Sequence, residues 1–283
     1  MSTSISTEQS SPYAKFLHSL WVIAQFELVR LFATRRGLLT LFTFSVVWYF
    51  LLTKGVMAAA NFIQQNTSAM PNALLNSAGL GTFLTWPVAE FSAYWTFSLY
   101  LFPIFSLLFS ADQTASDRDR GSLRFLMLRS SRDCVFFGRF AGQMIIQSAL
   151  VMVTLLSTLI VALTHNMESI AASLQCVLMI AANLILVLLP FTALMALLSA
   201  AVRSPLQAMI LALLVLLILS SVFSSINYRW PMLEFLTYLI PGIHLNELRE
   251  LPPTETLSLA YIPIFQTLFL LFVGRFVMAK GAL

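Results

Sequence analysis

The sequence predicts an all-α integral membrane protein, and two observations carry this prediction: an extreme composition and a regular series of long apolar segments. Of the 283 residues, 59% are hydrophobic and only 10% are charged, whereas a soluble globular chain is about 45–50% apolar and about 25% charged. One soluble core cannot bury this excess, so much of it must face lipid. The length suits one membrane domain of several helices and leaves no room for a separate soluble enzyme domain.

Six segments are apolar over the roughly 20 residues that a helix needs to cross the hydrocarbon core. We expect spans at about 38–60, 91–111, 138–163, 171–201, 205–226 and 257–279. A charge at the membrane centre costs about 2.5–3.5 kcal/mol, so Arg203 separates the fourth span from the fifth. The region 38–283 is therefore predicted to be a single transmembrane domain with outer loops at 61–90 and 227–256. Within the second loop, the stretch before Pro241-Gly242 is too short to span, and we expect a short helix there.

Lys and Arg are unevenly distributed between the two sides of these spans, and this bias predicts the orientation of the chain. Alternate sides carry 13 and 2 of the 16 basic residues, and Lys54 lies within the first span. The richer side includes both ends of the chain and the loop 112–137. Both termini and this loop are therefore predicted to be cytoplasmic.

The segment 14–36 is predicted to form an amphipathic interfacial helix along the cytoplasmic membrane surface. Glu27 and Arg30 are three residues apart, so they share one polar stripe on a helix with a wide apolar face. We expect Trp21 at headgroup depth and the arginines over anionic lipid. The alternative is an extra buried span, which the charges on the segment disfavour. The polar residues 1–13 before it are expected to be a disordered cytoplasmic N-terminus.

Motifs for catalysis, metal binding and ATP hydrolysis are absent from the sequence. It contains no HExxH or GxSxG motif and no cluster of acidic residues and histidines. It also lacks a Walker A motif, so the chain is not expected to hydrolyse ATP by that route. The centres of spans three to six carry no Asp, Glu, Lys or His, which disfavours an ion-coupled transporter. We therefore expect no enzyme activity, no metal and no cofactor in this chain, and an energy source outside the membrane domain.

The loop 112–137 gathers more charge than orientation alone explains. It holds nine of the 28 charged residues, with acidic residues first and arginines after. Asp117 and Asp119 suit a helix N-terminus, and an apolar run that includes Leu123 and Leu126 needs a surface to bury against. A basic loop that only sets topology is the simpler alternative, but it would need neither the acids nor the apolar run. We interpret the loop as a docking element.

The residues of this loop carry a resemblance to a known family. The run DRDRGSL at 117–123 is followed by Ser131-Arg132 and then by GRFAG at 138–142. This order is similar to the pattern (E)R(E)(R/K)GT(L)…(S)R…GK..G, which lies between the second and third spans of ABC-2 type transporter permeases. Asp117 stands where Glu is usual and Arg139 replaces a Lys, so the charge types are kept. The six spans, the interfacial helix and the long last outer loop also match that architecture.

The resemblance implies the permease subunit of an ABC transporter with a type V exporter-like fold, in a bacterial inner membrane. Two copies, or one copy and a paralogous permease, would form the pathway, and a separate cytoplasmic ATPase would bind ATP and Mg²⁺. The sequence is also similar to the permease of the nitrous oxide reductase maturation transporter. Membrane lipid is an expected partner, a periplasmic protein could contact the acidic loop 227–256, and no nucleic acid is expected.

The resemblance further implies roles for individual residues. A short coupling helix around 117–127 would sit in a groove of the ATPase, with apolar anchors and a charged rim. The expected coupling residues are Asp117, Arg118, Asp119, Arg120, Gly121, Leu123, Leu126 and Arg132. Spans two and five are implied to line the dimer interface, so their hydroxyl groups are candidates for the pathway: Ser92, Thr96, Ser220, Ser221 and Ser224. Ordinary helix packing is the alternative explanation of those hydroxyl groups.

Two other classes of function stay open from the sequence. One is a secondary transporter or channel, and the other is a membrane scaffold that docks a cytoplasmic partner through the loop 112–137. Co-purification with an ATPase, and stimulation of that ATPase, would distinguish the ABC permease from both. The transported substrate does not follow from the sequence.

Overall fold

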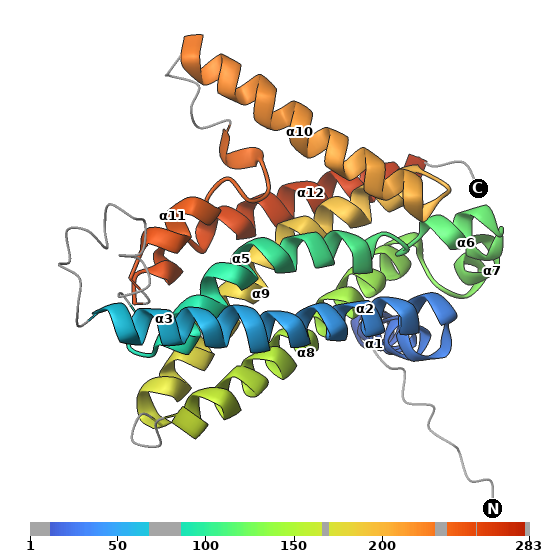
Figure 1. The fold of residues 1–283 in the computed structure, drawn as a ribbon. Helices are drawn as coiled ribbons and strands as arrows, with labels where there is room; N and C mark the ends of the chain where they lie inside the picture. Colours follow the sequence, from blue (N-terminus) through green and yellow to red (C-terminus); the bar gives the residue numbers. More distant parts are fainter. Residues whose placement is uncertain (1–11, 68–85, 166–169, 230–236, 253, 281–283) are drawn as a thin grey trace, which may run out of the picture.

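The computed structural model describes residues 12–67, 86–165, 170–229, 237–252 and 254–280, which form a bundle of helices (Figure 1). The helices are α1 (Pro12–Ala33), α2 (Arg35–Phe50), a π-helical turn (Leu51–Val56), α3 (Met57–Thr67), α5 (Ala89–Ser110), α6 (Ala115–Asp119), α7 (Ser122–Arg129), α8 (Arg132–His165), α9 (Ile170–Ala201), α10 (Pro205–Arg229), α11 (Leu245–Glu250), a 3₁₀ helix (Thr256–Leu259) and α12 (Tyr261–Lys280). No strand occurs among the residues described. The predicted all-α membrane fold is confirmed.

Seven helical stretches of the described chain are long and apolar enough to cross a membrane. Six of them overlap the six predicted spans: Gly37–Phe62, Ala89–Asp119, Arg132–Thr164, Ile170–Ala201, Pro205–Phe223 and Thr256–Lys280. The seventh, Lys15–Ala33, covers most of the predicted interfacial helix. Length and composition do not separate a spanning helix from an interfacial one, so the count of six spans stays a prediction.

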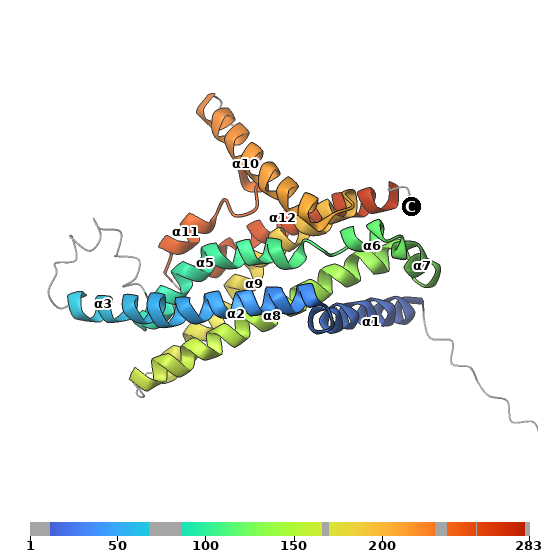
Figure 2. The same ribbon diagram turned by 45° about the vertical axis from the view of Figure 1, so that its right-hand side comes forward.

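Helix α1 lies across one end of the bundle instead of along it. It is foreshortened beside α6 and α7 in both views, whereas α2 and α5 run lengthwise (Figures 1 and 2). The chain turns at Thr34, whose extended backbone ends α1 and whose hydroxyl accepts a hydrogen bond from the Gly37 N–H. Only glycine fits at position 37, because a Cβ there would lie 2.1 Å from the carbonyl oxygen of Leu31. This sharp corner gives α1 the crosswise orientation that an interfacial helix requires.

Helices α5 and α9 form the centre of the bundle. In each of them 67% of the most apolar stretch is buried, compared with 39% in α8, 33% in α12 and 11% in α10. The largest buried side chains include Tyr94 and Trp95 of α5 and Leu184 and Leu188 of α9. Helix α10 instead diverges from the bundle toward its C-terminal end (Figures 1 and 2).

Hydrogen bonds between side chains join α5, α8 and α9. Thr192 of α9 donates to Oε1 of Gln147 on α8 at 3.0 Å and lies 3.1 Å from the Ser106 hydroxyl of α5. Gln147 in turn donates to the Ser110 hydroxyl at 2.9 Å. Because these groups satisfy one another away from water, they fix the register of α5, α8 and α9 inside an otherwise apolar core.

The outer segments follow the predictions only in part. In the loop predicted at 61–90, α3 continues as far as Thr67, and residues 68–85 lie outside the described chain. The short helix predicted before Pro241-Gly242 falls partly on residues 230–236, which also lie outside it. Gly242 makes a left-handed turn with φ +88°, and the chain then forms α11 and the 3₁₀ helix, which the sequence had not indicated.

Candidate functional site

The loop 112–137, which we call the coupling loop, forms a compact element at the end of the bundle where α1 lies (Figure 1). Asp112 begins it by accepting a hydrogen bond from the Ser116 N–H at 3.2 Å, which supports the start of α6. Gly121 separates α6 from α7 with φ +70°, a left-handed conformation that favours glycine. The segment expected to form one coupling helix around 117–127 thus contains two short helices, and α8 already begins at Arg132, before the predicted start of the third span.

One face of the coupling loop is tied to the ends of the central helices. Arg118 donates a hydrogen bond to the carbonyl oxygen of Ala200 at the end of α9, and Arg132 donates to that of Ala279 at the end of α12. The last carbonyl groups of a helix lack hydrogen-bond partners within the helix and carry partial negative charge. Each guanidinium group therefore stabilises the helix end that it contacts. These two predicted coupling residues thus face the bundle.

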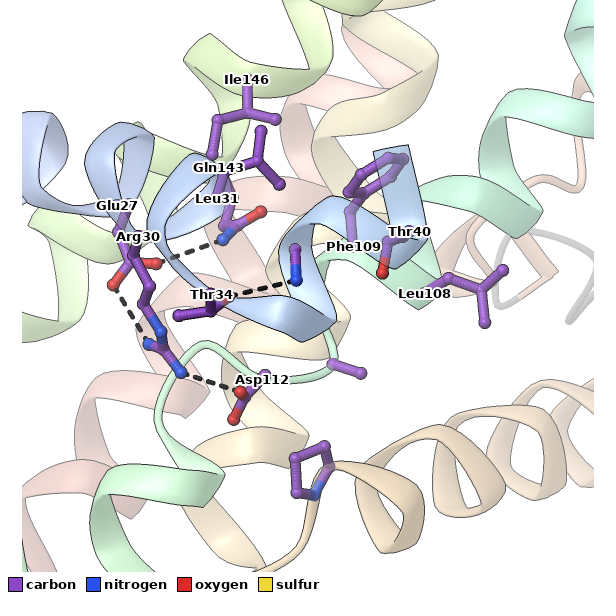
Figure 3. Close-up of a pocket in the computed structure, with 13 residues that line it drawn as sticks. Glu27, Arg30, Leu31, Thr34, Thr40, Leu108, Phe109, Asp112, Gln143 and Ile146 are labelled. Carbon is purple, nitrogen blue, oxygen red and sulfur yellow. Dashed lines mark hydrogen bonds and ion pairs between the residues drawn. The ribbon is translucent and has the colours of Figure 1, made fainter. Parts of the chain in front are cut away.

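Five acidic and basic side chains, here called the ion cluster, join α1, the coupling loop and α8: Glu27, Arg30, Asp112, Asp117 and Arg139. Figure 3 shows Glu27, Arg30 and Asp112. Arg30 donates to Asp112 at 2.8 Å, and its Nη1 lies 3.5 Å from Oε1 of Glu27. Arg139 pairs with Asp117, and its Nε lies 3.8 Å from the same Glu27 oxygen. Glu27 and Arg139 are only 2% and 3% exposed. Removal of one member would leave a buried charge unpaired, which is far more costly than the loss of an exposed pair.

Asp117 is the member of the ion cluster that lies on the coupling loop itself. Burial opposes ionisation of this carboxyl, but the nearby guanidinium groups of Arg139 and Arg30 outweigh burial and hold the pKa of Asp117 below its usual value. The Ser122 hydroxyl also donates to its Oδ1 at 3.0 Å. Asp117 therefore stays ionised at neutral pH and stabilises the folded loop, and this contribution is lost only as the pH falls through its lowered pKa.

The other face of the coupling loop is exposed and partly apolar. Phe125 is 74% exposed and Leu128 is 83% exposed, and the charged Asp119 and Arg120 of the same loop are exposed as well. Leu123, predicted as an anchor for a partner, is instead only 5% exposed and packs inside the protein. Its role is to support α7 from beneath.

Leu126, the second predicted anchor, is partly buried against the same internal cluster as Leu123. The anchors available to a partner in this structure are therefore Phe125 and Leu128, and the sequence run around them had not distinguished them from their neighbours.

Two glycines allow α1 to pack closely against α8. A Cβ at Gly138 would lie 3.0 Å from the side chain of Ile23, and one at Gly142 would lie 2.8 Å from Cβ of Glu27. The GRFAG segment at 138–142 thus serves as a small-residue packing surface. It brings Arg139 into contact with the charges of α1.

The structure corrects the expected placement of the polar stripe on α1. Glu27 and Arg30 face α8 and the coupling loop, so Arg30 does not lie over anionic lipid as the sequence had suggested. The face of α1 that points away from the protein is apolar, with Trp21 52% exposed and Phe26 59% exposed. This leaves an apolar surface toward lipid and buries the charges against the protein.

The hydroxyl groups predicted for the pathway are not brought together within one chain. Ser92 is buried in α5, and Thr96 donates to the backbone of its own helix. Ser220 and Ser221 are exposed on α10, which diverges from α5 (Figure 1). The side chain of Ser224 lies outside the described part of the structure.

Sequence reasoning missed two residues of this region. Asp112 was counted only as one of the charges of the loop, and Gln143 was overlooked although it hydrogen-bonds Glu27 at 3.4 Å. The sequence could have indicated both residues. Asp112 is the first charged residue after the second apolar span, and Gln143 lies four residues before Gln147 within the third apolar span. Polar residues at helical spacing in an apolar segment mark its protein-facing side.

Among the described residues, no group of three or more His, Cys, Asp or Glu side chains is placed to hold a metal ion. Cys134 and Cys176 are both buried and free.

Comparison with known proteins identifies the family. A search of curated proteins finds no matching relative. The family model described as ABC-2 family transporter protein matches residues 16–273, which cover most of α1, the coupling loop, the first five predicted spans and most of the sixth. The chain therefore belongs to the ABC-2 transporter family and is a membrane subunit of an ABC transporter.

Proposed function

We propose that this chain is the non-catalytic permease subunit of an ABC exporter. Two copies, or one copy with a paralogous permease, form the pathway in a bacterial inner membrane, with both termini cytoplasmic. A separate ATPase binds ATP and Mg²⁺ on the cytoplasmic side and drives the pathway through the coupling loop. Membership of the ABC-2 family supports this proposal, as does the absence of a Walker A motif from the sequence.

The observation that carries the proposal is the division of the coupling loop into two faces. The outward face exposes Phe125 and Leu128, which are apolar side chains of the kind that anchor a protein interface. The same loop also exposes the charges of Asp119 and Arg120, which suit the polar rim of such an interface. A loop that only set topology would have no need of an exposed apolar face at this position.

The inward face provides the path by which a movement of the loop reaches the membrane helices. Arg118 holds the end of α9 and Arg132 holds the end of α12. The ion cluster connects the same loop to α1 and α8. An ATPase that displaced the loop would therefore pull on four helices, most firmly through the buried Arg139, which is costly to leave without its partners.

The exposed face of α10 supports the dimer in this proposal. Leu213, Leu217 and Ile218 are each more than half exposed, although α10 is the most apolar of the long helices. Helix α10 leaves the bundle at an angle (Figure 2). A second permease that packed against α10 would supply the neighbours that the helix lacks in the single chain.

The test of this function is the variant Leu128→Asp in the complex of permease and ATPase. Because Leu128 is 83% exposed, the substitution leaves the fold intact. A carboxylate forced into an apolar contact costs several kcal/mol, so stimulation of the ATPase by the permease should fall at least about tenfold.

Leu128→Met keeps an apolar side chain at the same place and is the matched control, with stimulation close to that of the parent. Normal stimulation and normal transport by Leu128→Asp would refute the assignment of this face to the ATPase.

Three finer parts of the hypothesis stay predictions. They are the similarity to the permease of the nitrous oxide reductase maturation transporter, the direction of transport and a periplasmic partner at 227–256. Purification of the complex with its ATPase and its outer partners, followed by transport in inverted vesicles, addresses all three.

A further inference from the structure

Helix α9 is held at two levels by two different parts of the chain. In the first part of the helix, Asn183 donates a hydrogen bond to the hydroxyl of Thr256, in the 3₁₀ helix, at 2.8 Å. Both side chains are buried, with only 3% and 1% of their surface exposed. Because water does not compete for a buried bond, this contact fixes the first part of α9 to the segment between α11 and α12.

The last part of α9 is held by the coupling loop instead. Three side chains at the start of the loop donate hydrogen bonds to it: Gln113 to the carbonyl of Thr192 at 3.4 Å, Thr114 to the hydroxyl of Ser199 at 3.1 Å and Arg118 to the carbonyl of Ala200. Gln113 and Thr114 are themselves buried. The three bonds extend along about two turns of α9, so the start of the loop and this part of the helix form one body.

Pro190 lies between these two levels of α9. Proline has no N–H, so residue 190 cannot donate to the carbonyl of Leu186, and the proline ring crowds that carbonyl. The backbone of α9 is therefore weakest at this point, and sharp bends in helices occur at such residues. A helix that is fixed to different segments before and after its weakest point can bend there and keep the hydrogen bonds on both sides.

Helix α5, the other helix at the centre of the bundle, has a similar arrangement. Its interior proline is Pro103, and three residues later the Ser106 hydroxyl lies 3.1 Å from that of Thr192. The last part of α5 then continues directly into the coupling loop. In the other described helices, proline occurs only in the first turn, where its missing N–H costs no intrahelical bond.

We propose that α5 and α9 are hinged at Pro103 and Pro190. The coupling loop and the parts of both helices that follow these prolines move together, and the part of α9 before Pro190 stays with Thr256. Gln113 is a positioning residue that joins the loop to the moving part of α9. The inference rests on the proposed function, in which an ATPase displaces the loop, and adds the points at which the membrane helices take up that displacement.

The experiment titrates the ATPase with the full-length permease and measures two quantities. One is the maximal stimulation of ATP hydrolysis, and the other is the permease concentration that gives half of it. Pro190→Ala and Pro190→Gly both restore the missing N–H, but glycine keeps the helix flexible and alanine stiffens it. We expect the maximal stimulation by Pro190→Gly to exceed that by Pro190→Ala about fivefold, the factor that corresponds to their difference in helix propensity. The half-maximal concentration should not change, because Phe125 and Leu128 are untouched.

The order of these two variants separates a hinge from simple packing. If Pro190 served only to fill space, Pro190→Gly would be the more damaging variant, because glycine leaves a larger cavity than alanine. Gln113→Leu keeps the buried volume but removes the bond to Thr192, and it should lower the maximal stimulation at an unchanged half-maximal concentration. Pro263→Ala is the matched control: Pro263 is buried in the first turn of α12, and both quantities should equal those of the parent.

Thermal unfolding of each variant confirms that it is folded. If the parent permease gave no stimulation, the proposed function would fail and the hinge with it. If the parent stimulated the ATPase but Pro190→Ala matched or exceeded Pro190→Gly, or Gln113→Leu kept the parent maximum, the hinge alone would be refuted.

Discussion

Helices α9 and α10 follow one another in the chain and are almost equally apolar, yet they lie in opposite environments. The mean hydropathy of their most apolar stretches is 2.5 and 2.6, whereas 67% of the first and 11% of the second is buried. Helix α9 contains buried Asn183, Thr192 and Ser199, all hydrogen-bonded, and the exposed face of α10 is aliphatic. Hydropathy thus predicts that a helix enters the membrane. Small and polar residues within the helix indicate that it is surrounded by other helices and not by lipid.

The largest expected difference between the two helices comes from truncation of a leucine in each. Leu188 of α9 is fully buried, and Leu188→Ala should lower the free energy of unfolding by about 2–5 kcal/mol because it leaves a cavity. Leu217 of α10 is 64% exposed, and Leu217→Ala should change the free energy of unfolding by less than about 0.5 kcal/mol. Unfolding of the single subunit in mixed micelles measures both, and equal effects would contradict the contrast.

A smaller difference is expected from the hydroxyl groups. Thr192→Val removes the hydrogen bonds to Gln147 and Ser106 in the bundle and should cost about 0.6 kcal/mol, at most about 1.7 kcal/mol, the range measured for such bonds between membrane helices. Ser221→Ala on α10 is the control, since that hydroxyl bonds only the Leu217 carbonyl of its own helix. A neutral Thr192→Val would mean that the bundle does not depend on this network.

The smallest effect on stability is expected from Leu217→Cys. The same variant tests directly whether a second subunit packs against α10. The change in unfolding free energy should stay within about 0.5 kcal/mol, but a bifunctional thiol reagent should join two subunits through this residue. Cys134 and Cys176 are buried and do not compete.

Val153→Cys provides the comparison for the cross-link, because Val153 is 59% exposed on α8 and is expected to face lipid. Cross-linking at position 153 and not at 217 would move the dimer contact to another helix.

The positions of the long helices could be predicted because the cost of burying charge in lipid acts on each segment separately. The start of the third span was less predictable. It was expected at 138, but α8 begins at Arg132, and its first turn is stabilised from afar by Arg275, which donates to Asp133 at 2.7 Å. Charged residues that seem to end a helix can thus extend it when a distant residue pairs with them.

The two faces of the coupling loop could not be predicted, because their partners are remote in sequence. Helical spacing groups neighbours such as Leu123 and Leu126, but Arg118 binds a carbonyl 82 residues away and Arg132 binds one 147 residues away. The motif drew attention to the loop as a whole. Only the fold distinguishes the residues that hold it from the residues that it presents.

The ion cluster also bears on how the chain is made. Glu27 and Arg30 leave the ribosome well before Asp112, Asp117 and Arg139, since domains emerge from the N-terminus onward. During that interval their charges have only each other as partners, and charges of this kind are expensive within the hydrocarbon. On the predicted interfacial placement, α1 would stay in the headgroup layer until α8 has been inserted. The order of synthesis would then favour the crosswise position of α1 as well as the finished fold does.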